Sequence, residues 1–271
     1  TTGRIEANNM HITFDASNGN AAMNLESGGN RFDNVVFDSQ GESPYSYGFS
    51  AKIRMGFGNN FTGCDFYPAV QAQMYGYTNA PWNIFFGCSF FHGFSNNQYV
   101  ERAVVTKSKF YNMTSSLSVA QSTVSDCEFR NIEQLDSVSS VLRNNIFINV
   151  KSLYSSGMIQ DNIFTDGSNL DIRGDGRLEM TGNYFYNLAS VYIVLNEGTA
   201  KVVNNVFDLT QLMIYSPPYY GTLTRINATD NYWNGAGYTS QRCQSGIIYC
   251  VSREDKLQIT KVFARLLPDH Y

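Results

Sequence analysis

Hydrophobic and polar positions along this chain recur in short segments that share one phrase. An apolar residue is followed three residues later by Asn, Cys or Ser and two residues after that by Phe, as in Leu142, Asn145 and Phe147. These anchors fall at Phe14, Phe37, Phe66, Phe90, Phe110, Phe129, Phe147, Phe164, Phe185, Phe207 and Trp233. Because they lie 17 to 29 residues apart with no helical pattern between them, the phrase predicts a stacked solenoid of short strands.

Alignment on the anchors indicates which positions face inward. Five residues before the anchor, each coil from the Phe37 coil onward has an apolar residue, from Phe32 to Ala228. Two residues before it stand Asn145, Asn162, Asn183, Asn205 and Asn231, preceded in earlier coils by Val35, Cys64, Cys88, Ser108 and Cys127. We expect the inward amides to pass hydrogen bonds from coil to coil. We also expect the same Asn residues to supply the left-handed backbone of a sharp corner.

A second strand is predicted after each anchor. Alternating segments such as Leu117–Val119, Leu153–Ser155, Leu170–Ile172, Val191–Ile193 and Leu212–Ile214 follow a second polar column that starts at His92. Aligned on their first apolar residue, these segments place Tyr154, Asp171, Tyr192 and Met213 in one outward column, with Arg173 and Tyr215 in the next. We therefore predict an all-β parallel solenoid of about ten to eleven coils of 17 to 29 residues over 1–235. The remaining 236–271 should be a C-terminal loop and cap in the same domain.

The ending of the chain carries a family resemblance. Asp230-Asn231-Tyr232-Trp233-Asn234-Gly235 and, later, Val262-Phe263-Ala264-Arg265-Leu266-Leu267-Pro268 follow the Asn-x-Phe coils. With these motifs the chain resembles secreted bacterial repeat proteins of the pectin-lyase-like, right-handed parallel β-helix superfamily, over about residues 10–268. The resemblance implies a right-handed, single-stranded β-helix and a place outside the cell or at its surface. It implies little about activity, because the repeated residues are structural.

Composition narrows the function classes. Charged residues make up 15% of the chain and the formal net charge is −4, which gives no electrostatic footprint for nucleic acid. No run of eighteen apolar residues is present, so we expect no membrane span. Since the chain begins Thr-Thr-Gly without an initiator Met or signal peptide, we expect it to be a processed product or a piece of a longer polypeptide, whose further domains are candidate partners.

The five cysteines fall into two groups. Cys243 and Cys250 flank six residues, a spacing at which a disulfide can close a terminal loop. Cys64, Cys88 and Cys127 stand in the inward column, where they are expected to be small buried side chains. Cys64 and Cys88 occupy consecutive coils, so the distance between them would allow a disulfide bond.

The chain lacks the usual motifs of the superfamily's polysaccharide-degrading enzymes. The paired acidic motifs of the superfamily's hydrolases and the calcium-binding Asp clusters of its pectate lyases are absent. No residue pattern indicates a metal or other cofactor, although the family resemblance keeps a bound Ca²⁺ ion as an alternative. A lyase of the Lys/Arg-based type needs only a cation on a uronate carboxylate and a nearby base, so it remains the preferred enzymatic alternative.

Two surfaces are candidates for binding a sugar chain. The first consists of Tyr154, Asp171, Arg173, Tyr192 and Tyr215, where rings can pack on sugar CH faces and charges can fix orientation. An ordinary strand surface would also hold such residues. The second lies in the longer coils 38–60 and 67–83, beside Lys52 and Arg54, and contains Tyr45, Tyr47, Tyr75, Tyr77 and Trp82.

Two hypotheses of function follow. In the first, an extracellular β-helix module binds, and in its strongest form cleaves, polysaccharide or cell-surface glycan along one face of the solenoid. In the second, the rod is a non-catalytic structural or adhesive stalk or fibre segment of a larger cell-surface or phage-tail protein. The absence of catalytic motifs favours the second somewhat.

Overall fold

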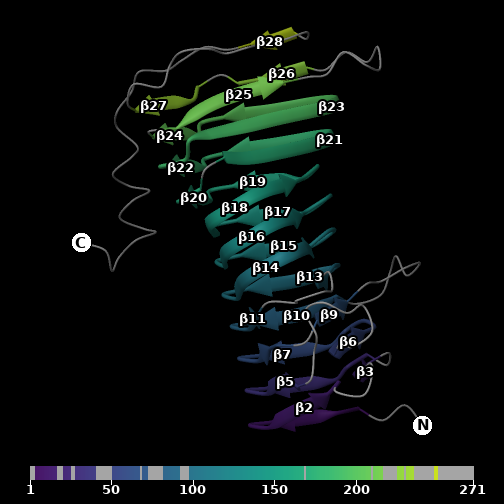
Figure 1. Ribbon diagram of the computed structural model, residues 1–271. Helices are drawn as coiled ribbons and strands as arrows, with labels where there is room; N and C mark the ends of the chain where they lie inside the picture. The colour runs from purple at the N-terminus through teal and green to yellow at the C-terminus, as the bar shows by residue number, and fades with distance from the viewer. Residues whose placement is uncertain are drawn as a thin grey trace.

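The protein is a parallel β-solenoid, as the repeated phrase predicts. The structure is a computed structural model that describes residues 4–16, 21–25, 28–40, 51–67, 69–72, 82–91, 98–167, 169–208, 210–215, 225–228, 230–234 and 247–249. Every regular element in these residues is a β-strand, and the strands stack in chain order from one end of the rod to the other (Figure 1). No helix in the described part is long and apolar enough to cross a membrane.

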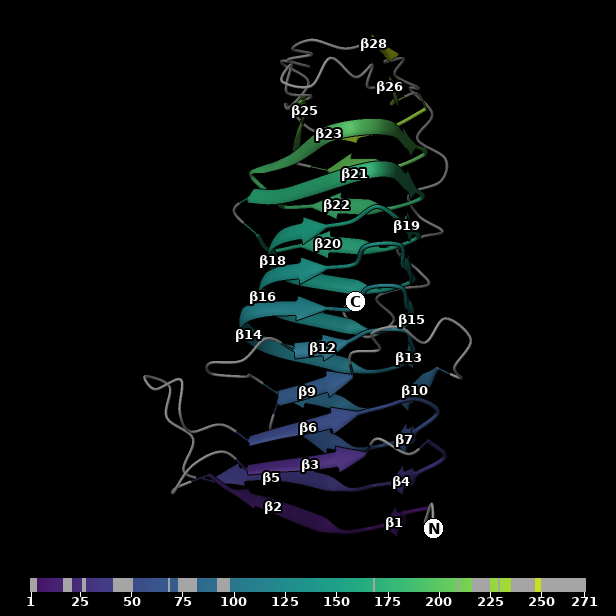
Figure 2. The same cartoon turned by 90° about the vertical axis from the view of Figure 1, so that its right-hand side faces the viewer.

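The turns of the solenoid contribute strands to three faces, in each of which neighbouring strands pair in parallel (Figures 1 and 2). The first face contains β1 (Glu6–Asn8), β4 (Arg31–Asp33), β7 (Asn60–Thr62), β10 (Asn83–Phe86), β13 (Ala103–Thr106), β15 (Thr123–Ser125), β17 (Val141–Arg143), β19 (Met158–Gln160), the ends of β21 (Asn169–Thr181) and β23 (Ser190–Val203), β26 (Arg225–Asn227) and β28 (Ile247–Tyr249). The second face contains β2 (His11–Asp15), β5 (Val36–Gln40), β8 (Asp65–Phe66), β11 (Ser89–Phe91), the beginnings of β14 (Lys109–Ser118), β16 (Glu128–Asp136) and β18 (Ile146–Tyr154), β20 (Ile163–Thr165), β22 (Tyr184–Tyr186), β24 (Val206–Asp208) and β27 (Tyr232–Asn234). The third face contains β3 (Ala21–Leu25), β6 (Ala51–Met55), β9 (Ala69–Ala72), β12 (Gln98–Val100), the ends of β14, β16 and β18, the beginnings of β21 and β23, and β25 (Gln211–Tyr215).

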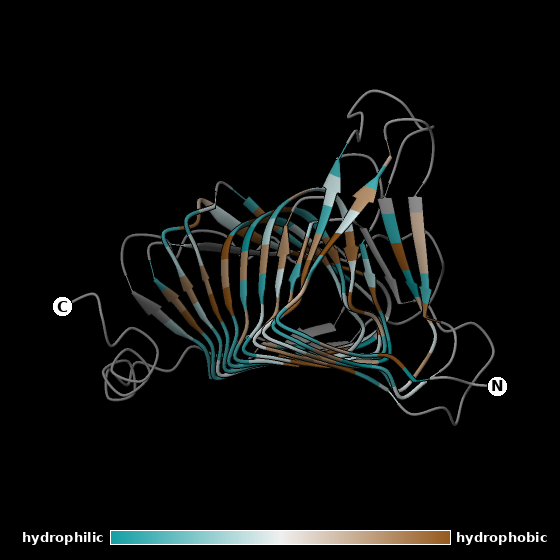
Figure 3. Cartoon of the chain, turned by 90° about the horizontal axis from the view of Figure 1, so that it is seen from below, coloured by the Kyte–Doolittle hydropathy of each residue, from teal (hydrophilic) through white to brown (hydrophobic). Residues whose placement is uncertain are grey.

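The interior is filled by columns of stacked side chains. Seen along the rod, successive strands lie over one another around a common interior (Figure 3). The anchor rings from Phe37 to Phe207 are fully buried and stack face to face, with centroids 4.5 to 5.0 Å apart. The rings five residues earlier, Phe32, Phe61 and Phe85, stack in the same way. The predicted inward columns are confirmed, because identical coil positions superimpose on neighbouring turns.

The first anchor was assigned wrongly. Phe14 pairs with Ser39, and Ile12 is the residue that pairs with Phe37. Ile12 therefore belongs to the anchor column of the first turn, and Phe14 lies two residues beyond it. The aromatic signal misled the alignment because this turn has an aliphatic residue at the anchor position.

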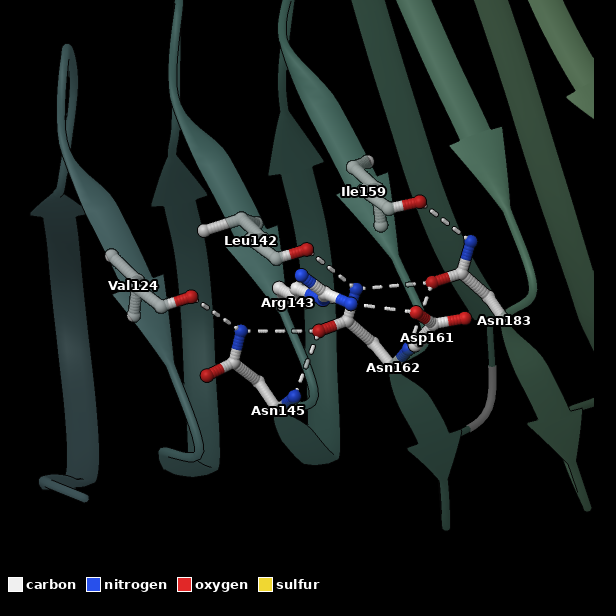
Figure 4. Close-up of polar contacts among 8 residues, drawn as sticks. All are labelled: Val124, Leu142, Arg143, Asn145, Ile159, Asp161, Asn162 and Asn183. Atoms are coloured by element: carbon white, nitrogen blue, oxygen red, sulfur yellow. Dashed lines mark hydrogen bonds and ion pairs between the residues drawn. The ribbon is translucent and has the colours of Figure 1, made fainter. Parts of the chain in front are cut away.

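The inward Asn residues form the predicted ladder. The side-chain oxygen of Asn162 accepts from the backbone N–H of Asn145 (2.9 Å), and the Asn162 amide donates to the carbonyl of Leu142 (2.9 Å) and to the side chain of Asn183 (3.0 Å) (Figure 4). The same contacts recur up to Asn205 and Asn231. Each amide thus gives an acceptor to an N–H that the corner would leave buried without one, and adds a hydrogen bond to a buried C=O.

The left-handed backbone lies one residue before the ladder, not at it. Positive φ angles between 51° and 71° occur at the residue preceding the ladder position in the successive turns, namely Asn9, Asn34, Gly63, Gly87, Lys107, Asp126, Asn144, Asp161, Gly182, Asn204 and Asp230. The polar column two residues after the anchor is also left-handed, at Asn112, Asn131, Asn149, Asp166 and Asn187. A ladder amide must point inward, so the corner is made by its neighbour, for which Asn, Asp and Gly carry the smallest steric penalty.

The three described cysteines replace Asn in this ladder and remain free thiols. Cys64 donates to the carbonyl of Phe32 (3.4 Å) and Cys88 to that of Phe61 (3.5 Å), the carbonyls that an Asn would reach. The Cys64–Cys88 bridge that the sequence left open is therefore not formed. Burial raises the pKa of Cys88, and it raises that of Cys127 to about 12.

Stability should fall at high pH partly through Cys127. Its pKa of about 12 in the folded protein lies above the ordinary value of 9.0, because burial disfavours the thiolate. The thiol's contribution is therefore complete below pH ~9 and is lost as the pH rises toward 12. Urea unfolding at pH 7 and pH 10.5 should show a smaller loss for Cys127→Ser than for the unchanged protein. Equal losses would contradict this linkage.

Of the predicted closing segment 236–271, the structure describes β28 alone. Its residues pair in parallel with β26, from Arg225 opposite Ile247 to Asn227 opposite Tyr249. The cap itself, His92 and the Cys243–Cys250 disulfide lie outside the described residues and stay predictions.

Candidate functional site

The third face brings most of the described candidate residues together in two outward columns. The first column, column A, consists of Ser116, Gln134, Ser152, Asp171 and Tyr192, and the main chain of Met213 pairs next in its register. The second, column B, consists of Ser118, Asp136, Tyr154, Arg173 and Val194, and the main chain of Tyr215 pairs next in its register. Between them run the buried side chains of Leu117, Leu135, Leu153, Ile172 and Ile193, which hold both columns on a rigid surface.

Tyr154 stands in column B and not, as predicted, with Asp171. Leu153 pairs with Ile172 and Tyr154 with Arg173, so the alignment of this turn was wrong by two residues. Leu153 follows its anchor Phe147 by six residues, whereas Ile172 follows Phe164 by eight. The corner after β20 is therefore two residues longer, and this extra length shifts which residues face each other across the turns.

Asp171 and Arg173 form the charged centre of the site. Arg173 Nε and Nη2 both donate to Asp171 Oδ2, at 2.9 and 2.7 Å. The Asp171 Oδ1 atom is buried and accepts no hydrogen bond from the described residues. The carboxylate raises the pKa of Arg173, through its hydrogen bonds and its charge, so the guanidinium stays protonated. The Arg173 side chain is 58% exposed, so the pair can be reached from solvent.

Tyrosines stand on the turns above and below this pair. Tyr192 is the direct neighbour of Asp171 on β23, and Tyr154 is the neighbour of Arg173 on β18. Both side chains are half-buried. Neighbouring strands lie ~4.8 Å apart and residues two apart on a strand lie ~7 Å apart. The four side chains therefore occupy one small diagonal patch, which we call the Tyr/Arg/Asp patch.

Asp136 extends this patch toward the N-terminal turns. It is the neighbour of Tyr154 on β16 and accepts from Ser116 Oγ at 2.9 Å and from Gln134 Nε2 at 3.1 Å. Both donors are uncharged, so Asp136 brings a second carboxylate to the surface and forms no ion pair with a cation of the described residues. The sequence reasoning did not include it, although its position in the alternation marked it as outward.

The chemistry of the Tyr/Arg/Asp patch suits binding better than catalysis. A lyase needs a cation that neutralises a uronate and a base that reaches the α-proton. The Arg173 charge is already shared with Asp171. By contrast, aromatic rings beside hydrogen-bonding charged groups are well suited to holding sugar rings, whose CH faces are apolar and whose edges are polar.

The second predicted surface is described only in part. Tyr45, Tyr47, Tyr75 and Tyr77 lie outside the described residues, as does the Tyr215 side chain. Trp82 is 41% exposed and immediately precedes β10 of the first face. Lys52 and Arg54 lie on β6 of the third face. The predicted union of these residues in one ledge remains untested.

Exposed hydrophobic residues that the sequence reasoning missed lie on β10 and on the second face. Ile84 and Phe86 are each 43% exposed, and Lys107 Nζ lies 5.4 Å from the centroid of the Phe86 ring. On the second face the rings of Tyr67, Phe91 and Tyr111 stack outward, with centroids 4.6 and 5.7 Å apart. Strict alternation with the buried Phe85 and with the anchors marks all of these positions as outward.

In the part of the chain that the structure describes, no three His, Cys, Asp or Glu residues gather to hold a metal. Comparison with protein families, curated proteins and solved structures found no match. The parallel solenoid is compatible with a β-helix superfamily, whereas the pectin-lyase-like assignment rests on the sequence motifs alone.

Proposed function

We propose that this protein is an extracellular or cell-surface module that binds polysaccharide along the third face of its solenoid. The observation that carries the proposal is the Asp171–Arg173 pair set between Tyr154 and Tyr192 on adjoining turns. In this proposal the tyrosine rings pack against sugar CH groups while the charged pair bonds to hydroxyl groups.

Rigidity supports the proposal. Main-chain pairing on both sides fixes the turns that carry the patch, and buried residues such as Leu153 and Ile172 lie directly beneath it. A surface that is ordered before it binds loses little conformational entropy when a ligand arrives. A sugar chain that runs along the rod also meets successive turns at the regular spacing of the strands.

Substitution of Tyr192 tests the proposal. In a glycan array followed by titration calorimetry, Tyr192→Ala should weaken binding of the recognised glycan about tenfold or more, because an aromatic platform is removed. Tyr186→Ala is the matched control: Tyr186 is an exposed tyrosine on the second face, and its loss should leave the affinity unchanged. No binding to any glycan, or equal effects of both substitutions, would refute the proposal.

The second candidate function is a non-catalytic structural or adhesive segment. The observation in its favour is the unbroken stack of anchor rings from Phe37 to Phe207, which makes the described rod stiff without reference to any ligand. A screen for unsaturated uronate by ultraviolet absorbance, run beside the glycan array, separates the possibilities. Binding with new absorbance supports a lyase, and binding alone supports the proposed module. If neither binding nor new absorbance is found, the structural segment is the function that remains.

A further inference from the structure

The described charges beside the Tyr/Arg/Asp patch sum to one negative charge. Among described side chains in columns A and B and on the adjoining positions of β16 and β18, the carboxylates are Glu133, Asp136 and Asp171, and the cations are Lys151 and Arg173. Lys151 is paired with Glu133 at 2.6 Å, and Arg173 with Asp171 at 2.7 Å. Asp136 therefore leaves one negative charge that these ion pairs do not offset.

The patch offers the carboxylates of Asp171 and Asp136 as acceptors, beside the donor groups of Arg173 and of the two tyrosines. Asp171 Oδ1 has no donor among the described residues, and Asp136 is held only by uncharged donors. The two oxygens of a carboxylate exchange places by rotation about a soft torsion, so Asp171 can present its free acceptor when Arg173 moves aside. Ionised carboxylates accept but cannot donate, so a matching ligand must offer O–H groups.

We infer that the polysaccharide bound at the Tyr/Arg/Asp patch is uncharged and rich in hydroxyl groups, and is not a polyuronate. This inference rests on the proposed function. A polyuronate would bring its carboxylates beside Asp136 and Asp171, where like charges repel. A neutral glycan avoids that repulsion, and its hydroxyl groups can donate to the Asp171 oxygen that has no donor among the described residues.

Matched oligosaccharides test the inference. Calorimetric titration should compare galactose, mannose and glucose oligomers with the galacturonate, mannuronate and glucuronate oligomers of equal length. We expect a neutral oligomer to bind at least about tenfold more tightly than its uronate counterpart. We also expect its affinity to change less than twofold between 50 and 300 mM NaCl, because no net ion pairing is involved. Asp136→Asn should narrow the gap between the two oligomers by improving the uronate.

The outcomes separate this inference from the function on which it rests. Preferential uronate binding that Tyr192→Ala abolishes would overturn the inference and leave polysaccharide binding at this face in place. A steep loss of affinity with salt would overturn it in the same way. Binding of neither class would overturn the proposed function together with the inference.

Discussion

Replacement of Phe147 by alanine should lower the free energy of unfolding by about 5 kcal/mol. Phe147 is buried and lies between the rings of Phe129, at 4.8 Å, and Phe164, at 4.5 Å. Alanine removes the buried apolar surface, leaves a cavity, and breaks two stacking contacts at once. The parallel turns above and below are held by main-chain pairing, so they cannot collapse readily into the space.

Urea unfolding followed by circular dichroism measures this loss, and Phe86→Ala is its control. Phe86 is 43% exposed on the first face, so the same change of residue type should cost less than about 1 kcal/mol. Hydrogen exchange should show the Phe147→Ala opening confined at first to the neighbouring turns, as expected for a quasi-one-dimensional fold. A Phe147→Ala loss no larger than that of the control would contradict the role given to the ring stack.

The sequence predicted the interior of this fold better than its surface, because interior positions repeat. Residues such as Leu142, Asn145 and Phe147 face the same neighbours in every turn, so one physical requirement recurs along the chain. Each turn therefore repeats the evidence of the previous one. The error at Phe14 arose where a single turn departs from the aromatic pattern and keeps the position with Ile12.

A second ladder escaped the sequence reasoning although its signal was present. Asn30 donates to Asn59 at 2.7 Å, and Asn59 to Asn83 at 3.1 Å, at the corner that opens the first face. Each of these amides lies two residues before an inward Phe, so an Asn-x-Phe phrase precedes the anchor phrase in each of these turns. Ser122 and Ser140 continue the same position in later turns. Alignment on one anchor per turn concealed this second register.

The outward residues were harder to place because nothing repeats there. A difference of two residues in one corner moved Tyr154 from the column of Asp171 to that of Arg173. The number of residues in a corner does not change the alternation inside a strand. The alternation in the sequence therefore does not show how long each corner is. Asp136 was missed for a related reason: only the true register shows that it adjoins Tyr154. The Asp171–Arg173 contact, by contrast, joins residues two apart on one strand and was evident from the sequence.

Replacement of Asn162 by alanine should lower the free energy of unfolding by about 4 kcal/mol. Its amide is almost fully buried at the centre of the described ladder. Without it, the backbone N–H of Asn145 loses its acceptor, the carbonyl of Leu142 loses its side-chain donor, and the bond to the side chain of Asn183 is lost. An orphaned buried N–H costs about 1–3 kcal/mol and each lost hydrogen bond about 1 kcal/mol, so the hydrogen bonds matter more than the small volume removed.

Asn162→Ser provides the sharpest control, because the chain contains its precedent. At Ser108 the hydroxyl accepts from the backbone N–H of Cys88 at 3.1 Å but donates to Thr106 of its own turn at 3.1 Å. A serine at 162 should therefore give the Asn145 N–H an acceptor again without restoring the side-chain bonds to Leu142 and Asn183, recovering about half of the stability lost in Asn162→Ala. Urea unfolding of both variants beside the exposed Gln134→Ala measures this order. Equal stability of the serine and alanine variants would show that the ladder acts by filling space and not by hydrogen bonding.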